Sequence, residues 1–270
     1  MSARLGLVLA ALVVASGVAA QERTECDDQW WGWRGPNAHV CEVRTLTVPA
    51  GGALSVDAGQ NGSIRVTGES RRDVQVRAKV HAWAYDDAEA ERIASSVNVR
   101  SDGVLRAEGP DQRGRSGWSV DYEVVAPRDT DLKLETHNGS IGVAAVRGDL
   151  ELEAENGSLR LDGVAGHVRG RTTNGGVEAE LTGRTWEGTG LDLETTNGAV
   201  RLRIPEDYSA RLETGTVNGG IDIDFPVTVT GRIGREFSTM LGGGGPLVRA
   251  ETTNGQVRIS RDRGDLTRLP

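Results

Sequence analysis

The sequence predicts an all-β fold, a single-stranded parallel β-helix or β-solenoid with rungs of about 18 residues and one short capping helix. Three observations predict it. Asn-Gly recurs at a nearly regular spacing, apolar and polar residues alternate on both sides of it, and equivalent positions of successive copies carry similar residues. A repeated corner between two half-buried strands is typical of a chain that coils and lays each strand beside the previous one.

Six copies of the repeat begin at residues 132, 150, 168, 191, 212 and 248. A divergent copy with Asn-Gly at 61 precedes them, and from 138 onward the Asn-Gly intervals are 18, 18, 23, 21 and 36 residues, the last being twice 18. We expect the corners to stack as a ladder, in which asparagine lies over asparagine and glycine supplies a positive φ. The ladder residues are Asn138, Gly139, Asn156, Gly157, Asn174, Gly175, Asn197, Gly198, Asn218, Gly219, Asn254 and Gly255.

A sandwich of hairpins is the alternative, because Asn-Gly favours the type I′ turn that joins antiparallel strands. The inward columns favour the coil, since they consist of Leu, Val, Ile, Ala and Thr, which suit a narrow interior. In the fifth column a threonine recurs in every copy except one, which has Ala154. Equivalent residues at a fixed period are expected when each strand lies parallel to its predecessor.

The N-terminal end predicts export. Residues 1–20 form a signal peptide, because Arg4 precedes an apolar run that is too short for a membrane span and that ends in Val18-Ala19-Ala20. Residues 21–42 form an N-terminal cap in which the chain's two cysteines, Cys26 and Cys41, form a disulfide. We therefore place the protein in the periplasm, at the cell surface or outside the cell, with no transmembrane segment after cleavage of the signal peptide.

The remaining chain is assigned as one β-solenoid domain, residues 43–260, followed by a polar tail, residues 261–270. A helical insertion at about 86–97 interrupts the strand pattern. Asp86, Asp87 and Glu89 suit a helix N-terminus, while Ala90 and Ile93 begin an apolar face. We expect this helix to cover the open edge at the start of the coil.

The charge of the exported chain excludes some partners. Without the signal peptide, 30 basic residues face 39 acidic ones, a net charge of about −9. A negative chain is not attracted to nucleic acid or to anionic lipid, so we expect no nucleic-acid partner.

The regular acids and bases of the repeat are interpreted as a solvated face. Glutamates occupy the outward fourth column and arginines the outward eleventh column, with opposite charges near the same corner. These column residues are Glu135, Glu153, Glu194, Glu251, Arg160, Arg201 and Arg258.

No catalytic motif is found in the sequence. The four histidines, at 39, 81, 137 and 167, lie far apart, although His137 and His167 could approach each other across one rung. Cys26 and Cys41 with His39 make an incomplete zinc set. We therefore expect no catalytic, cofactor-binding or metal-binding residues, and no enzyme.

Three further features of the sequence each have two possible interpretations. Trp30, Trp31 and Trp33 either cover the end of the coil or stack on sugar rings, and we favour the cap. Arg263-Gly264-Asp265 matches an integrin-binding tripeptide, but chance explains it in a chain this rich in Arg, Gly and Asp. The glycines at 242–245 indicate an irregular rung or a loop.

The repeated pattern L-x-L-x-T-x-N-G-x-I/V-x-V, at 132–143, 191–202 and 248–259, resembles a family of bacterial exported proteins of β-strand repeats known as putative adhesins, a domain of unknown function. The segment 242–259, GGGGPLVRAETTNGQVRI, is similar to the closing segment of that family. The resemblance covers about Val43 to Ser260. It implies a β-helix-like fold and a place in the cell envelope, and it supplies no catalytic residues.

The expected function is that of a non-catalytic cell-envelope protein, an adhesin or interaction scaffold, whose partner is an unidentified envelope protein or glycan. A glycan-cleaving β-helix enzyme is one alternative. A self-assembling structural protein of the envelope is the other, with self-association as its consequence.

Overall fold

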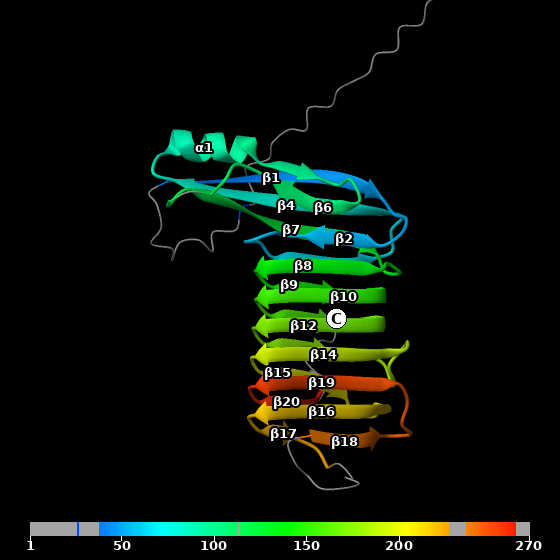
Figure 1. The fold of residues 1–270 in the computed structure, drawn as a ribbon. Helices are drawn as coiled ribbons and strands as arrows, with labels where there is room; N and C mark the ends of the chain where they lie inside the picture. Colours follow the sequence, from blue (N-terminus) through cyan, green and yellow to red (C-terminus); the bar gives the residue numbers. More distant parts are fainter. Residues whose placement is uncertain (1–25, 27–37, 113, 227–235, 263–270) are drawn as a thin grey trace, which may run out of the picture.

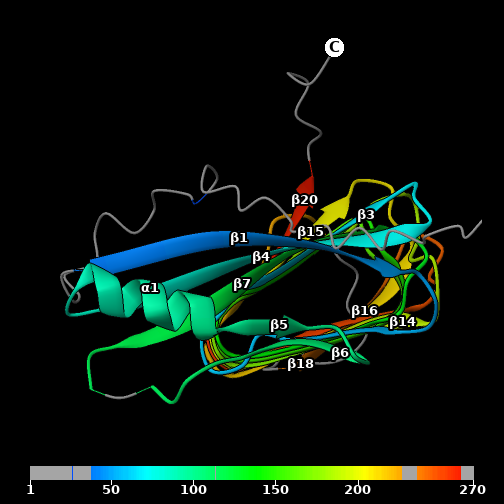
Figure 2. The same cartoon turned by 90° about the horizontal axis from the view of Figure 1, so that it is seen from above.

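The computed structural model describes residues 26, 38–112, 114–226 and 236–262. Two ten-stranded sheets lie face to face, and a column of parallel strands runs along one axis below a layer of longer strands (Figures 1 and 2). The facing residues of the two sheets form one apolar core, in which the largest fully buried side chains are leucines, isoleucines and Tyr122.

The first sheet contains, in order, β1 (Ala38–Pro49), β4 (Asp73–Ala84), β7 (Gly117–Pro127), β3 (Ile64–Glu69), β9 (Ile141–Ala144), β11 (Leu159–Asp162), β13 (Val177–Glu180), β15 (Val200–Pro205), β20 (Val257–Asp262) and β17 (Ile221–Ile223). The second contains β18 (Glu236–Leu241), β16 (Ala210–Asn218), β19 (Leu247–Asn254), β14 (Gly190–Asn197), β12 (Ala165–Asn174), β10 (Arg147–Asn156), β8 (Leu132–Asn138), β2 (Leu54–Asp57), β6 (Val104–Glu108) and β5 (Asn98–Arg100). A single helix occurs among the described residues, α1, which spans Asp87–Ser96.

The prediction of a single-stranded parallel β-helix is wrong, because both sheets are mixed. β4 pairs antiparallel with β1 and β7, β5 with β6, and β16 with β18. The long strands β1, β4 and β7 do not carry the Asn-Gly corner, so nothing turns the chain into the next rung and each strand returns beside its neighbour. The described part of the chain is all-β with one short helix, and it is not a closed solenoid.

The repeats themselves pair in parallel and in register. Asn156 of β10 lies opposite Asn138 on one side and Asn174 on the other, and the strands after the corner pair in the same way. The spatial order of the copies nevertheless differs from the chain order. β19 and β20, the last copy, lie between β14–β15 and β16–β17. The 36-residue interval is therefore not two rungs, since it contains the antiparallel strand β18.

The corner glycines serve a different purpose from the one expected. None of the six repeat glycines after asparagine has a positive φ. Instead, a Cβ on Gly157 would overlap the carbonyl oxygen of Gly139, and a Cβ on Gly175 would overlap that of Gly157. Glycine is required at the corner because the backbones of successive layers approach each other too closely for any side chain.

The corner asparagines form a continuous chain of side-chain hydrogen bonds. Nδ2 of each asparagine donates to Oδ1 of the asparagine in the layer above, as from Asn156 to Asn138 at 3.0 Å and from Asn174 to Asn156 at 2.8 Å. In spatial order the ladder consists of Asn61, Asn138, Asn156, Asn174, Asn197, Asn254 and Asn218. All its bonds point in one direction.

The buried threonines of the fifth column reinforce the corner. Thr172 donates its hydroxyl to the Gly157 carbonyl at 2.7 Å, and Thr195 bonds to Gly175 at 2.8 Å in the same way. Ala154 occupies this position in its own layer and is 6% exposed, so it offers no hydroxyl to the carbonyl of Gly139.

Replacing Ala154 with threonine should therefore stabilise the protein. The new hydroxyl would lie where the other layers place theirs and would donate to the Gly139 carbonyl, a net gain of about 1 kcal/mol. Urea unfolding measures the change, with Ala154→Val as the control, because valine has the same shape without the donor. Equal stability of the two variants would contradict the assignment of the gain to a hydrogen bond.

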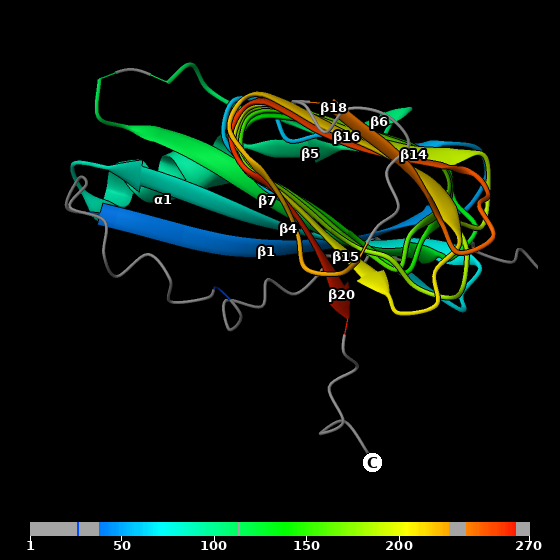
Figure 3. The ribbon, with the colours of Figure 1, turned by 90° about the horizontal axis from the view of Figure 1, so that it is seen from below.

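The helix α1 packs against β1 and β4 at one end of the stack (Figures 1 and 3), near the position that the sequence indicated. The Asp86 side chain accepts a hydrogen bond from the Glu89 amide at 2.8 Å, which caps the N-terminus. Arg44 of β1 donates to the carbonyls of Ala94 and Val97 at the other end of the helix. Cys26 is bonded to Cys41, and their Cα atoms are 6.1 Å apart.

Several sequence interpretations fall outside the described residues. They are the signal peptide at 1–20, the tryptophans Trp30, Trp31 and Trp33, and the Arg263-Gly264-Asp265 tripeptide in the polar tail.

Candidate functional site

The outer face of the second sheet is hollowed into a groove of about 1000 Å³. The groove crosses eight consecutive strands, from β18 to β2. Two outward columns line it. The fourth column of the repeat supplies mostly carboxylates. The sixth column supplies three threonines, together with His137, Glu155 and Val217. The outward polar lining residues are Asp57, Glu135, His137, Glu153, Glu155, Arg171, Thr173, Glu194, Thr196, Glu236, Glu251 and Thr253, and the buried threonines Thr136, Thr172, Thr195, Thr216 and Thr252 also border the groove.

Basic residues pair with several of the groove carboxylates. Lys133 contacts Glu135 at 2.9 Å and Arg249 contacts Glu251 at 2.8 Å, each on its own strand. The only arginine of the lining, Arg171, contacts Glu194 of the next strand at 3.2 Å. Carboxylates still outnumber basic side chains along the lining, so the groove attracts positive charge.

The predicted glutamate and arginine columns flank the same corner but lie on the outer faces of different sheets. The glutamates of the fourth column lie on the second sheet, whereas Arg160, Arg201 and Arg258 lie on the outer face of the first sheet. Arg160 contacts Glu178 at 2.9 Å and Arg258 contacts Asp222 at 3.1 Å, each on an adjacent strand. The corner separates the two columns because the chain turns there from one sheet into the other.

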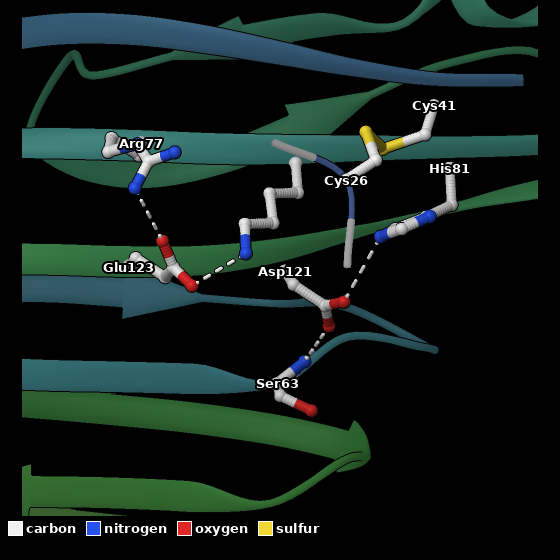
Figure 4. Close-up of polar contacts among 8 residues, drawn as sticks. Cys26, Cys41, Ser63, Arg77, His81, Asp121 and Glu123 are labelled. Carbon is white, nitrogen blue, oxygen red and sulfur yellow. Dashed lines mark hydrogen bonds and ion pairs between the residues drawn. A yellow bond between two sulfur atoms is a disulfide. The ribbon is translucent and has the colours of Figure 1, made fainter. Parts of the chain in front are cut away.

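A second polar cluster lies on the outer face of the first sheet, where β4 and β7 meet β1 and β3 (Figure 4). The buried His81 places Nε2 3.3 Å from the Asp121 carboxylate and Nδ1 3.3 Å from Nε2 of His39. Asp121 also accepts the Ser63 backbone amide at 2.6 Å. Cys41 lies opposite His81 in the β1–β4 register, so the disulfide borders this cluster.

Burial alone would raise the pKa of Asp121, and the hydrogen bonds from His81 and from the Ser63 amide oppose that rise. With the charges of His81 and Lys79 added, the pKa of Asp121 lies below its ordinary value. Beside it, Glu123 accepts contacts from Lys79 at 2.7 Å and from Arg77 at 3.2 Å. The cluster is a network of paired charges that joins β4 to β7.

The sequence did not bring His39 and His81 together, because 42 residues separate them and only the antiparallel register of β1 and β4 makes them neighbours. His137 and His167, by contrast, pair with different acids. His137 contacts Glu155, and His167 contacts Asp149 at 3.1 Å. The two histidines therefore belong to separate ion pairs.

The His39–His81 pair predicts a loss of stability on mild acidification. Partial burial and the neighbouring His81 lower the pKa of His39 below its ordinary value of about 6.5. A lowered pKa means that the folded state binds this proton less readily than the unfolded chain. Stability is therefore fully present above pH about 6.5 and falls as the pH drops below it, through the lowered pKa.

Thermal unfolding between pH 7.5 and 5 measures this effect, with His39→Gln as the test variant. We expect the stability of this variant to fall less between pH 7.5 and 5 than that of the unsubstituted protein, because glutamine does not titrate. His167→Gln is the matched control, since this exposed histidine has an acid partner and no histidine neighbour. The same pH dependence in both variants would contradict the role given to His39.

Within the part of the chain that the structure describes, no group of three or more His, Cys, Asp and Glu side chains could hold a metal ion. The single helix found there is too short to cross a membrane.

No protein-family model matches the sequence, and no curated protein matches it. Among the solved structures that are similar to the chain, three each cover 82% of it. One is a putative cell adhesion protein from Clostridium sporogenes, 12% identical and covered over 100% of its length, with a TM-score of 0.47.

The other two are putative adhesins. The protein from Bacteroides fragilis is 13% identical and covered over 97% of its length, with a TM-score of 0.35. The protein from Parabacteroides merdae is 9% identical and covered over 96%, with a TM-score of 0.28. These three structures bear a description like that of the family that the repeated motif resembles.

Proposed function

We propose that this chain is an exported, non-catalytic binding scaffold, and that its partner lies in the groove of the second sheet. The observation that carries the proposal is the register of the layers, which places outward carboxylates on six of eight adjacent strands and outward threonine hydroxyls on three of the eight. Neighbouring strands lie about 4.8 Å apart, so a partner with regularly spaced groups can contact several layers at once.

The chemistry of the lining favours an extended basic polypeptide as the partner. Carboxylates dominate the fourth column, and the hydroxyls of Thr173, Thr196 and Thr253 supply hydrogen bonds beside them. Sugar recognition usually relies on aromatic faces, and the described lining of the groove contains no aromatic ring apart from His137. A positively charged chain would satisfy both columns without stacking.

A non-catalytic role is supported by how the acids are arranged. Three groove glutamates on different strands, Glu135, Glu194 and Glu251, each contact a basic side chain. A glycosidase needs two carboxyl groups that act on opposite sides of one bond, one of them protonated as the acid. The groove carboxylates are instead spread over many layers, and several are paired with basic side chains. This arrangement suits adhesion to an extended partner better than it suits cleavage of one bond.

A direct binding measurement tests the proposal. The probe is a fluorescent Lys-Gly repeat peptide of about nine residues, long enough to cross six layers when extended. We expect fluorescence anisotropy to show binding that weakens steeply with salt. Glu153→Gln, Glu194→Gln and Glu251→Gln together should reduce the affinity at least about tenfold, since each charged contact is worth a fraction of a kcal/mol or more.

The matched control places three neutral substitutions on the first sheet, Glu178→Gln, Glu180→Gln and Asp222→Asn. These residues are also outward acids with basic partners, so they change the net charge by the same amount. Equal loss of binding in both triple variants would show that net charge alone attracts the peptide. That result, or absence of binding by the unsubstituted protein, would overturn the proposal.

A further inference from the structure

The last copy of the repeat fills a slot whose walls come from earlier in the chain. One wall is β14 and β15, the other is β16 and β17, and residues 247–262, here called the insert, lie between them. Without the insert, β14 would not reach β16, and β15 would not reach β17. The slot exists in both sheets, so it accepts a complete layer rather than a single strand.

The hydrogen bonds of the insert repeat those of the other layers that carry a threonine in the fifth column. Asn254 donates to Asn197 at 2.8 Å and accepts from Asn218 at 2.7 Å. Thr252 donates to the Gly198 carbonyl at 2.8 Å. Both walls therefore recognise the insert through the same groups that join consecutive layers, and these groups are identical in every molecule of the protein.

The wall formed by β16 and β17 has few direct links to the other wall. Among the described residues, the backbone links from this wall to the part of the chain above the slot are the Thr185–Ser209 bridge, the bond from the Ser209 amide to the Arg184 carbonyl at 2.8 Å and the bond from the Tyr208 amide to the Pro205 carbonyl at 3.3 Å. The insert thus joins β16, β17 and β18 to the remainder of the stack. Removing it would open the lower end as one unit.

The segment that leads into the insert is suited to act as a hinge. β18 and β19 lie on opposite sides of β16, and Gly242–Pro246 crosses between them. Gly242, Gly244 and Gly245 have φ values of 51°, 80° and 148°. Residues other than glycine rarely adopt these backbone conformations. Because glycine can adopt many backbone conformations, this segment can change its path at a small cost in conformational free energy.

We propose that the insert is exchangeable, so that two copies of this chain pair by each placing residues 247–262 in the slot of the other. Such an exchange preserves every contact of the closed monomer and changes only the path of the hinge. The partner is therefore a second copy, recognised through its own Thr-x-Asn-Gly corner. This inference concerns assembly and does not depend on the ligand of the groove.

Mixing two variants of the full chain, each with one cysteine in addition to the Cys26–Cys41 disulfide, tests the exchange. Glu194→Cys and Glu251→Cys change outward residues that face each other across β14 and β19. The two pools are mixed at high protein concentration, oxidised mildly and separated on a non-reducing gel, and the linked peptides are identified by mass spectrometry. Exchange brings the two thiols within bonding distance in different molecules, so we expect a cross-linked heterodimer.

The control mixture uses Glu135→Cys and Glu153→Cys, which face each other in β8 and β10, two copies that follow one another in the chain. The exchange pair should yield at least about tenfold more heterodimer than this control, because thiols that stay in separate folded chains rarely approach within about 7 Å. If the first pair misfolds, Arg201→Cys and Arg258→Cys test the same exchange across β15 and β20. Yields equal to the control from a folded monomer would overturn the proposal.

Discussion

Gly157→Ala is expected to destabilise the protein by about 3 kcal/mol, a typical cost of overpacking a tightly packed site. The new methyl group would overlap the Gly139 carbonyl oxygen, and this oxygen belongs to the backbone, so no side-chain rotation relieves the overlap. The asparagine ladder and the strand pairing hold the two layers at a fixed distance. For a domain of this size, the unfolding temperature should fall by on the order of 10 °C.

Gly142→Ala is the matched control for this substitution. Gly142 lies in β9, in the layer above Gly157, and a Cβ there would meet no atom within 4 Å. We expect the stability of the Gly142→Ala variant to stay within about 1 kcal/mol of that of the unsubstituted protein. A small gain is expected where alanine lowers the conformational entropy of the unfolded chain. Similar losses of stability in the two variants would show that the close spacing of the layers does not explain the glycine at the corner.

Asn174→Asp is expected to cost about 1–3 kcal/mol at neutral pH. Asn174 donates to Asn156 Oδ1 at 2.8 Å and accepts from Asn197 at 2.9 Å. A carboxylate can still accept from Asn197, but it would place an acceptor against the acceptor of Asn156. Chemical unfolding at pH 7 and near pH 4 measures the loss.

The loss should shrink on acidification, because a protonated carboxyl group recovers the donor. The folded variant would hold this proton more tightly than the unfolded chain, in which the pKa is about 3.9, so its relative stability rises as the pH falls. Asn61→Asp is the control. Asn61 accepts the ladder bond from Asn138 at 3.1 Å, and an aspartate keeps that acceptor. A loss at Asn61 as large as that at Asn174 would contradict the single direction of the ladder.

The sequence alone determined the local structure of the repeat. Alternating residues on either side of Asn-Gly placed Leu150 and Leu152 in the core and Glu151 and Glu153 outside, because side chains of a strand point to opposite faces in turn. The helix near 86–97 followed from its acidic start and apolar face, and the pair of cysteines indicated the disulfide. These features depend on neighbours in the chain or on a fixed period.

The tertiary structure alone decided the order of the layers and the direction of the longer strands. The Asn-Gly corner is the same in every copy, so it specifies that one layer fits another but not which one, and the last copy could take the slot between the fourth and fifth. The meeting of His39, His81 and Asp121 likewise required the antiparallel register of β1, β4 and β7. Pairing partners far apart in the chain are chosen by the packing of the whole sheet, and no short stretch of residues encodes that choice.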